Sequence, residues 1–151
     1  MTLALSRTTS DDPDFRALIA VLDDDLHERY GPVQDLYAVH NLFSCDTVIV
    51  ARLDGVAVGC GCFKRYDDAT VELKRMIVLP AHRGAQIGRT LVRALEAWAV
   101  ELGYRAAVLE TGDRQHEALR MYRACGYHDI PLYGPYVDLP NSVCLRRTLT
   151  A

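Results

Sequence analysis

The sequence predicts an α/β fold on a mixed sheet, and three patterns along its 151 residues carry that prediction. β-branched segments on either side of Asp54–Gly55 indicate an antiparallel hairpin, because this dipeptide is a preferred two-residue turn. Apolar residues at helical spacing from about Gln86 to Leu102 indicate a long amphipathic helix. A strand before that helix and one after it, at Ala106–Glu110, are expected to form a parallel pair joined by a crossover. Residues 1–151 are interpreted as one domain.

The N-terminal third is expected to hold one strand and two helices. Residues 2–7 alternate like an edge strand, and Ser10–Asp11–Asp12–Pro13 combines capping side chains with an early proline. The apolar residues that follow recur at helical spacing: Phe15, Leu18, Ile19, Leu22 and Leu26. Gly31–Pro32 ends this helix, and a second short helix is expected over about 33–43.

The rest of the chain alternates strands with helices. Three antiparallel strands come first, at Thr47–Leu53, Val56–Tyr66 and Thr70–Leu79. The long helix then ends at Gly103, and it is followed by a buried strand, a helix and a final strand, at Ala106–Glu110, Arg114–Ala124 and Val143–Leu149. The order is strand, helices, three strands, helix, strand, helix and two strands, which is typical of a mixed sheet.

Composition and cysteine usage indicate a soluble cytoplasmic protein. Half of the residues are hydrophobic and a quarter are charged, as in ordinary globular proteins. No stretch approaches the roughly 20 apolar residues of a membrane span, so no membrane partner is expected. The five cysteines lack zinc-site spacing and a secretory context, so we expect reduced, buried thiols and no metal.

Charge is distributed unevenly along the chain. Acidic side chains dominate residues 1–35, whereas residues 74–93 contain no acidic residue and carry Lys74, Arg75, Arg83, Arg89 and Arg93. A basic middle suggests a polyanionic ligand at that place, although solvated charges placed by chance give the same pattern. The net charge of −3 is too mild to indicate a nucleic-acid partner.

The segment from Met76 to Arg89 has the pattern of an anion-binding site. A strand stops at a proline, a tight turn with Gly84 follows, and a helix begins near Gln86. The first turn of a helix presents unpaired backbone N–H groups and the positive end of the dipole, and Arg83 adds charge. Such a helix start can hold a phosphate, although a glycine turn before a helix is a plain loop about as often.

Two further motifs lie downstream of this segment. Glu110-Thr-Gly-Asp-Arg-Gln115 follows the next strand, and Gln115-x-x-Ala118-x-x-x-Tyr122-x-x-x-Gly126-Tyr127 covers the next helix and its exit. Together with the element order of the whole chain, they resemble the GNAT (Gcn5-related N-acetyltransferase) superfamily, most specifically from Glu72 to Tyr127, and in particular its small bacterial members of undefined substrate. The family's cofactor motif is Arg/Gln-x-x-Gly-x-Gly/Ala, and its downstream motif is Asn-x-x-Ala-x-x-x-Tyr-x-x-x-Gly-Phe/Tyr. This chain departs at Gln86, where glycine is usual, and at Gln115, where asparagine is usual.

The resemblance implies a fold and a co-substrate. The fold is a central mixed sheet of about six or seven strands flanked by about four helices, with a V-shaped splay between the strands at 70–79 and 105–111. The co-substrate is acetyl-CoA, without a metal. The backbone of Met76, Ile77 and Val78 would pair with the pantetheine arm, and the diphosphate would lie against Arg83, Gly84, Ala85, Gln86, Ile87, Gly88 and Arg89. Gln115 and Tyr122 are expected beside the cofactor as well, with a weakened or altered contact at Gln115.

The resemblance also implies transfer of the acetyl group to a primary amine, expected to be a small molecule. Tyr122 would donate a proton to the departing thiolate, or it is a packed core aromatic instead. Glu110 and Glu72 each match the general base of one family branch, and either could be a strand-end surface carboxylate. A protein lysine or N-terminus as acceptor, and a non-catalytic acyl-CoA-binding module, remain alternatives. A homodimer is one oligomeric state that the family allows.

The acceptor pocket is implied to lie among the two N-terminal helices and the loop between the last strands. Those parts are rich in acidic and aromatic side chains, namely Asp23, Asp24, Asp25, Glu28, Asp35, Tyr30, Tyr37, Tyr133 and Tyr136. A cationic amine would fit such a surface, although the acidic run could be a solvated helix face.

Overall fold

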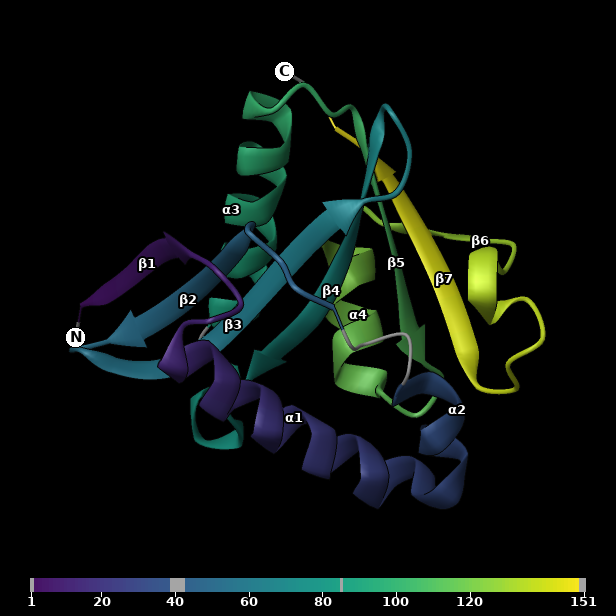
Figure 1. Cartoon of the computed structure of the whole chain (residues 1–151), viewed down its shortest axis with the longest axis horizontal. Coiled ribbons are helices and arrows are strands. Elements are labelled where there is room, and N and C mark those ends of the chain that lie inside the picture. The colour runs from purple at the N-terminus through teal and green to yellow at the C-terminus, as the bar shows by residue number, and fades with distance from the viewer. Residues whose placement is uncertain (1, 39–42, 85, 150–151) are drawn as a thin grey trace.

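Seven strands form one mixed sheet in the order β1-β2-β3-β4-β5-β7-β6 in the computed structural model, which describes residues 2–38, 43–84 and 86–149 (Figure 1). The strands are β1 (Leu3–Thr8), β2 (Val48–Leu53), β3 (Val56–Arg65), β4 (Thr70–Val78), β5 (Ala106–Gly112), β6 (His128–Ile130) and β7 (Ser142–Thr148). The α-helices within the described ranges are α1 (Pro13–Tyr30), α2 (Asp35–Ala38), α3 (Ile87–Glu101) and α4 (His116–Ala124). One-turn 3-10 helices lie at Gly31–Gln34, Pro80–His82 and Gly134–Tyr136. The predicted mixed sheet with flanking helices is confirmed.

Helices cover both faces of the sheet. Phe15, Leu18 and Leu22 of α1 pack on one face, against alternate residues of the central strands such as Val48 and Val50. The buried faces of α3 and α4 pack on the other face, where the intervening residues Ile49 and Ala51 lie. Since successive side chains of a strand point to opposite faces, the continuous apolar run of β2 supplies two cores at once.

The predicted start of α1 is confirmed, but the prediction for the next helix is wrong. The Asp12 carboxylate caps α1 by accepting hydrogen bonds from the backbone N–H groups of Asp14 (2.8 Å) and Phe15 (3.4 Å). The helix expected over 33–43 is instead a 3-10 turn at Gly31–Gln34 followed by the single turn α2. Residues 39–42 of that expectation lie outside the described residues.

The strands β4 and β5 run parallel and separate partway along. They pair from Thr70 with Ala106 to Leu73 with Leu109, and no pairing between them continues beyond Leu73 in the described chain. The V-shaped splay that the family resemblance implied is therefore present. It leaves the β5-facing edge of the second half of β4 without a partner strand.

A β-bulge that the sequence did not predict lies in β4 beside this opening. Cys60 pairs with Ile77 and Cys62 pairs with Lys74, so Arg75 and Met76 together face the single residue Gly61. Arg75 takes a left-handed backbone conformation (φ 59°), as one residue of a bulge can. A Cβ on Gly61 would lie 2.1 Å from Sδ of Met76, so the absence of a side chain there makes room for the bulge.

Candidate active site

A cleft of about 380 Å³ opens between the splayed strands. Its lining comes from the second half of β4, the turn after it, the start of α3, one face of α4, and Leu22 and Asp25 of α1. All predicted cofactor contacts that the structure describes border this cleft, namely Met76, Ile77, Val78, Arg83, Gly84, Gln86, Ile87, Gly88, Arg89, Gln115 and Tyr122. Ala85 lies outside the described residues. The resemblance thus placed residues from three separate segments around one opening.

The free edge of β4 presents backbone polar groups to this cleft. The backbone N–H of Leu79 donates to the carbonyl of Val58 on β3 (2.9 Å), so the neighbouring Val78 directs its own N–H and carbonyl to the opposite edge. Nε of Arg83 donates to that carbonyl (2.9 Å) and leaves the Val78 N–H facing the cleft. An extended ligand with amide groups could pair along this edge as an added strand does.

The start of α3 forms the other end of the cleft. The Thr90 N–H donates to the carbonyl of Gln86 (3.0 Å), and no side chain caps the helix among the residues described, so the N–H groups of Ile87, Gly88 and Arg89 precede the first helical hydrogen bond. Gln86 adopts a left-handed conformation (φ 62°, ψ 17°), which explains physically why glycine is usual at this place. Free amides at a helix start, with two arginines beside them, suit a diphosphate.

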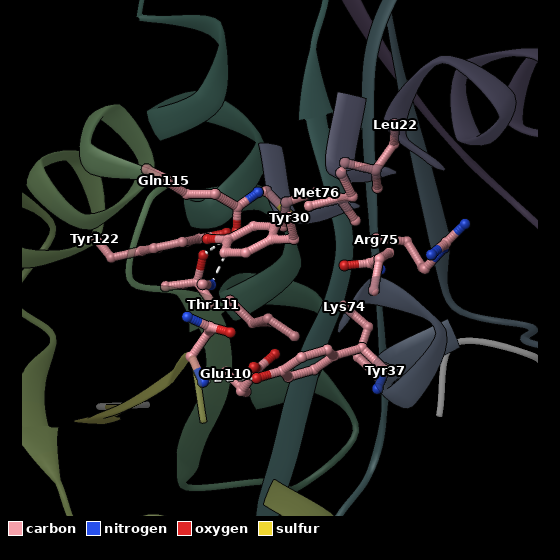
Figure 2. Close-up of a pocket in the computed structure, with 16 residues that line it drawn as sticks. Leu22, Tyr30, Tyr37, Lys74, Arg75, Met76, Glu110, Thr111, Gln115 and Tyr122 are labelled. Atoms are coloured by element: carbon pink, nitrogen blue, oxygen red, sulfur yellow. Dashed lines mark hydrogen bonds between the residues drawn. The ribbon is translucent and has the colours of Figure 1, made fainter. Parts of the chain in front are cut away.

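A smaller cavity of about 100 Å³ lies next to the cleft and shares Leu22, Met76, Gln115, Ala118 and Tyr122 with it. Polar side chains make up much of its remaining lining, namely Tyr30, Gln34, Tyr37, Lys74, Arg75, Glu110, Thr111 and Asn141. In Figure 2, Tyr122 and Gln115 come from one side, Lys74 and Arg75 come from the other, and Glu110 lies below them. The two cavities therefore meet beside Tyr122.

Glu110 is the carboxylate on this smaller cavity. It sits on the part of β5 that has separated from β4, where Oε2 accepts a hydrogen bond from the Ser142 hydroxyl (2.7 Å). Burial raises the pKa of Glu110 to about 7, against the opposing effects of this hydrogen bond and of the Lys74 charge. A carboxyl group with this pKa is partly ionised at neutral pH and can accept a proton from an amine.

Glu72, the other carboxylate expected as a base, does not border the small cavity. Its Oε2 accepts a hydrogen bond from the Tyr133 hydroxyl (2.7 Å), and its Oε1 lies 3.8 Å from Nζ of Lys64 and 4.0 Å from Nζ of Lys74. The side chain is buried in a polar cluster on the sheet. The structure thus places Glu110, and not Glu72, in the lining of the small cavity that Tyr122 also borders.

Tyr122 lies on α4, is largely buried, and borders both cavities. Its ring packs edge-on against Tyr127 with centroids 5.9 Å apart. Burial raises the pKa of Tyr122 above its ordinary value, so the phenol stays protonated at neutral pH. Within the described ranges no side chain or backbone group hydrogen-bonds to this hydroxyl, which leaves its proton available.

The side-chain carbonyl oxygen of Gln115 is hydrogen-bonded within the chain. Its Oε1 accepts hydrogen bonds from the Thr111 hydroxyl (2.5 Å) and the Gly112 N–H (3.0 Å), which ties the start of α4 to the end of β5. The Nε2 group keeps its donors, and the residue borders both cavities. The weakened or altered cofactor contact expected at Gln115 stays a prediction.

The acidic run of α1 does not line the small cavity, contrary to the expectation. Asp23 accepts a hydrogen bond from Arg75 (2.9 Å), and Asp25 forms an ion pair with Arg29 (3.2 Å). Of the expected aromatic residues, Tyr30 and Tyr37 border the cavity, whereas Tyr133 and Tyr136 pack against each other near Glu72. These carboxylates pair with arginines because α1 carries both charges on neighbouring turns and faces a basic strand.

Sequence patterns did not indicate Gln34 or Lys74 as binding groups on the small cavity, or Ser142 as the hydrogen-bond partner of Glu110. Gln34 and Ser142 are in irregular or terminal positions without a motif, and Lys74 was counted only as part of a basic segment. Alternation along β4 was the one usable signal, since it places Lys74 on the same face as Glu72.

Two further features are absent from the described residues. None of the helices there is long and apolar enough to cross a membrane. No cluster of three or more His, Cys, Asp or Glu side chains suited to a metal ion occurs in the same part of the chain.

Comparisons with known proteins agree with this geometry. The family model described as Acetyltransferase (GNAT) family matches residues 13–127. A curated protein of Azospirillum brasilense, IAA acetyltransferase, is 39% identical over 102 residues, which is 67% of each chain. A crystal structure from Klebsiella pneumoniae subsp. pneumoniae, assigned by name to the acyl-CoA N-acyltransferases, is 32% identical with a TM-score of 0.82 over 99% of both chains. A GNAT family acetyltransferase of Elizabethkingia anophelis with acetyl-CoA bound shares the fold, at 18% identity and a TM-score of 0.70 over 97% of this chain and 98% of that one.

Proposed function

Because this chain belongs to the GNAT acetyltransferase family, we propose that it transfers the acetyl group of acetyl-CoA to a primary amine of a small molecule. The observation that carries the proposal is the meeting of the two cavities beside Tyr122. A thioester at the inner end of the cleft would face an amine held in the small cavity, next to Glu110. One group that accepts a proton and one that donates a proton then flank the reacting atoms.

The cleft fits acetyl-CoA on its own features. The unpaired edge of β4, with the Val78 N–H, offers hydrogen bonds to the amide groups of pantetheine. The uncapped start of α3, with Arg83 and Arg89, offers N–H groups and positive charge to the diphosphate. These residues bind and orient the co-substrate, and no metal is needed to neutralise its charge.

The proposed reaction uses Glu110 and Tyr122 in turn. Glu110 accepts a proton from the ammonium form of the acceptor, and the free amine nitrogen attacks the thioester carbonyl carbon. As the new C–N bond forms, the C–S bond breaks, the nitrogen releases its second proton to solvent, and the Tyr122 phenol gives its proton to the departing sulfur. The carbonyl oxygen is stabilised by a backbone N–H of β4, near Ile77 or Val78. Proton exchange with solvent afterwards restores Glu110 and Tyr122.

The size of the small cavity supports a small-molecule acceptor. A cavity of about 150 Å³ can hold benzene, so the roughly 100 Å³ seen here suits a ligand portion of a few heavy atoms. A bulky amine does not fit inside it without rearrangement of the walls.

The test is release of CoA thiol from acetyl-CoA across a panel of small amines, beside calorimetric titration with CoA. We expect micromolar to millimolar CoA binding and acetylation of at least one small amine. CoA binding without transfer to any amine would favour a non-catalytic binding module. Acetylated lysines or N-termini in co-incubated proteins, found by mass spectrometry with no small acceptor, would favour a protein acetyltransferase. No binding of CoA or acetyl-CoA would remove the enzyme assignment altogether.

A further inference from the structure

Lys74 places a buried ammonium group at the small cavity, whose expected lining was acidic. The side chain is 5% exposed, and its Nζ donates a hydrogen bond to the Tyr136 hydroxyl (2.9 Å). The nearest carboxylate oxygen, on Glu72, is 4.0 Å away, which is too far for a hydrogen bond. An ammonium group has three donors, so Lys74 retains hydrogen-bonding capacity on the cavity side. Burial lowers the pKa of Lys74, and a bound anion would relieve that penalty.

Gln34 adds a second polar side chain to the same cavity. It ends the 3-10 turn after α1, borders the cavity, and is only 5% exposed. No hydrogen bond to its side-chain amide occurs among the described residues, and none of their fully buried side-chain nitrogen or oxygen atoms lacks a partner, so the amide atoms remain open to the cavity. A polar ligand in the cavity can therefore hydrogen-bond to this amide.

The cavity also holds the Glu110 carboxyl group, which forms no ion pair with Lys74 among the described residues although their charges interact. Glu110 is hydrogen-bonded to Ser142, and the described ion pair of Lys74 is with Glu72 rather than with Glu110. Arg75 is already engaged by Asp23 at 2.9 Å. One cavity of about 100 Å³ thus presents a positive and a negative group separately, which complements a small zwitterion.

We propose that the acetyl acceptor is a small amino acid, whose carboxylate binds to Lys74 and Gln34 while its amine lies at Glu110. This inference rests on the proposed acetyltransferase function and narrows its substrate class. A simple alkylamine is a poor match, because its ammonium form would share the cavity with the Lys74 charge and offer no acceptor to it. Only the amino group next to the carboxylate would then reach the thioester.

The test compares acceptors that differ only in the carboxylate. Alanine and ethylamine form one pair, and glycine and methylamine form another. For each pair, kcat/KM is measured by thiol release, and the ratio of the two values is taken in the wild type and in Lys74→Met. Comparing ratios between enzymes cancels the intrinsic basicity of each amine. Lys64→Met is the matched control, since Lys64 also lies near Glu72 (3.8 Å) but does not border the cavity.

We expect the wild type to favour the amino acid of each pair, Lys74→Met to lower that ratio at least tenfold, and Lys64→Met to leave it unchanged. Gln34→Leu should also lower the ratio, and this variant serves as the test if Lys74→Met does not fold. The inference is overturned if the wild type uses ethylamine as well as alanine, or if neither variant changes the ratio. If the wild type binds acetyl-CoA but acetylates none of the amines, the proposed function is overturned, and this inference with it.

Discussion

The Ser142 hydroxyl on β7 donates a 2.7 Å hydrogen bond to Oε2 of Glu110 on the adjacent strand β5. A hydrogen bond to the ionised carboxylate favours the charged form, so it opposes the burial that raises the pKa of Glu110 to about 7. The proton affinity of the proposed base therefore depends on a residue 32 positions away in sequence.

Ser142→Ala should raise the pKa of Glu110, because it removes the hydrogen bond and leaves the burial. A hydrogen bond to a charged group is worth about 1.5–3 kcal/mol, which corresponds to a shift of roughly one to two pH units. The measurement is the acid limb of the kcat/KM profile, which should move to higher pH while the plateau changes little. Ser6→Ala, on the distant strand β1, is the control. An acid limb that stays in place would show that this hydroxyl does not influence the titrating group.

Glu110→Gln should abolish the acid limb near pH 7 and lower kcat by about a hundredfold or more, the usual contribution of a general base. Glu72→Gln should keep that limb, because Glu72 does not reach the small cavity. The same profile measured on both variants separates the two carboxylates that the sequence left as alternatives. If Glu72→Gln loses the limb and Glu110→Gln keeps it, the base is Glu72.

The pH dependence of stability is a second test of the raised pKa of Glu110. Its pKa in the folded state, about 7, is above the ordinary value of 4.5, so folding favours the protonated carboxyl. The free energy of unfolding should therefore fall as pH rises from about 4.5 to about 7 and level off above the folded-state pKa. Glu110→Gln should lack this part of the decline in urea titrations. Identical declines in both proteins would mean that Glu110 titrates normally.

Tyr122→Phe should lower kcat at least tenfold while acetyl-CoA binding is retained, because the variant keeps the ring that packs on Tyr127 and loses only the phenol proton. Steady-state kinetics on the true acceptor, with calorimetry for the cofactor, measure both quantities. An unchanged kcat would remove the proton-donor role and leave Tyr122 as a packed aromatic. Tyr104→Phe, which alters a tyrosine bordering neither cavity, is the control.

Short-range patterns were sufficient for most of the elements, apart from the helix expected over 33–43. The Asp12 cap, the hairpin at Asp54–Gly55 and the start of α3 each depend on residues within a few positions of one another. The cleft residues were implied by the family resemblance, through motifs that lie at one strand end and two helix starts. Their positions around the cleft could be predicted because the fold of the family was recognised.

The acceptor side could not be predicted in the same way, because it depends on contacts between distant segments. Strict alternation along β4 would put Lys74 and Arg75 on opposite faces of the sheet. The bulge opposite Gly61 keeps both on the α1 side, where Arg75 meets Asp23. The residues next to Arg75 in the sequence do not indicate a bulge. The space for Met76 comes from Gly61, which lies on the neighbouring strand β3. The sequence left Glu72 and Glu110 as alternative bases, and only the splay and the tertiary contacts distinguish them.

Gln86 provides a test of the helix start at which the chain departs from the family motif. Its left-handed conformation costs a residue with a Cβ roughly 1–2 kcal/mol, and glycine avoids that cost but adds about 0.5–1 kcal/mol of backbone entropy. Gln86→Gly should therefore stabilise the fold slightly, by under about 1 kcal/mol, and keep or improve CoA affinity. Gln86→Val should destabilise it and weaken CoA binding, because a β-branched side chain is strained at positive φ and would distort the N–H groups of α3. Thermal unfolding and calorimetry with CoA measure both effects. Equal CoA affinity in the glycine and valine variants would mean that the backbone at this position does not shape the diphosphate site.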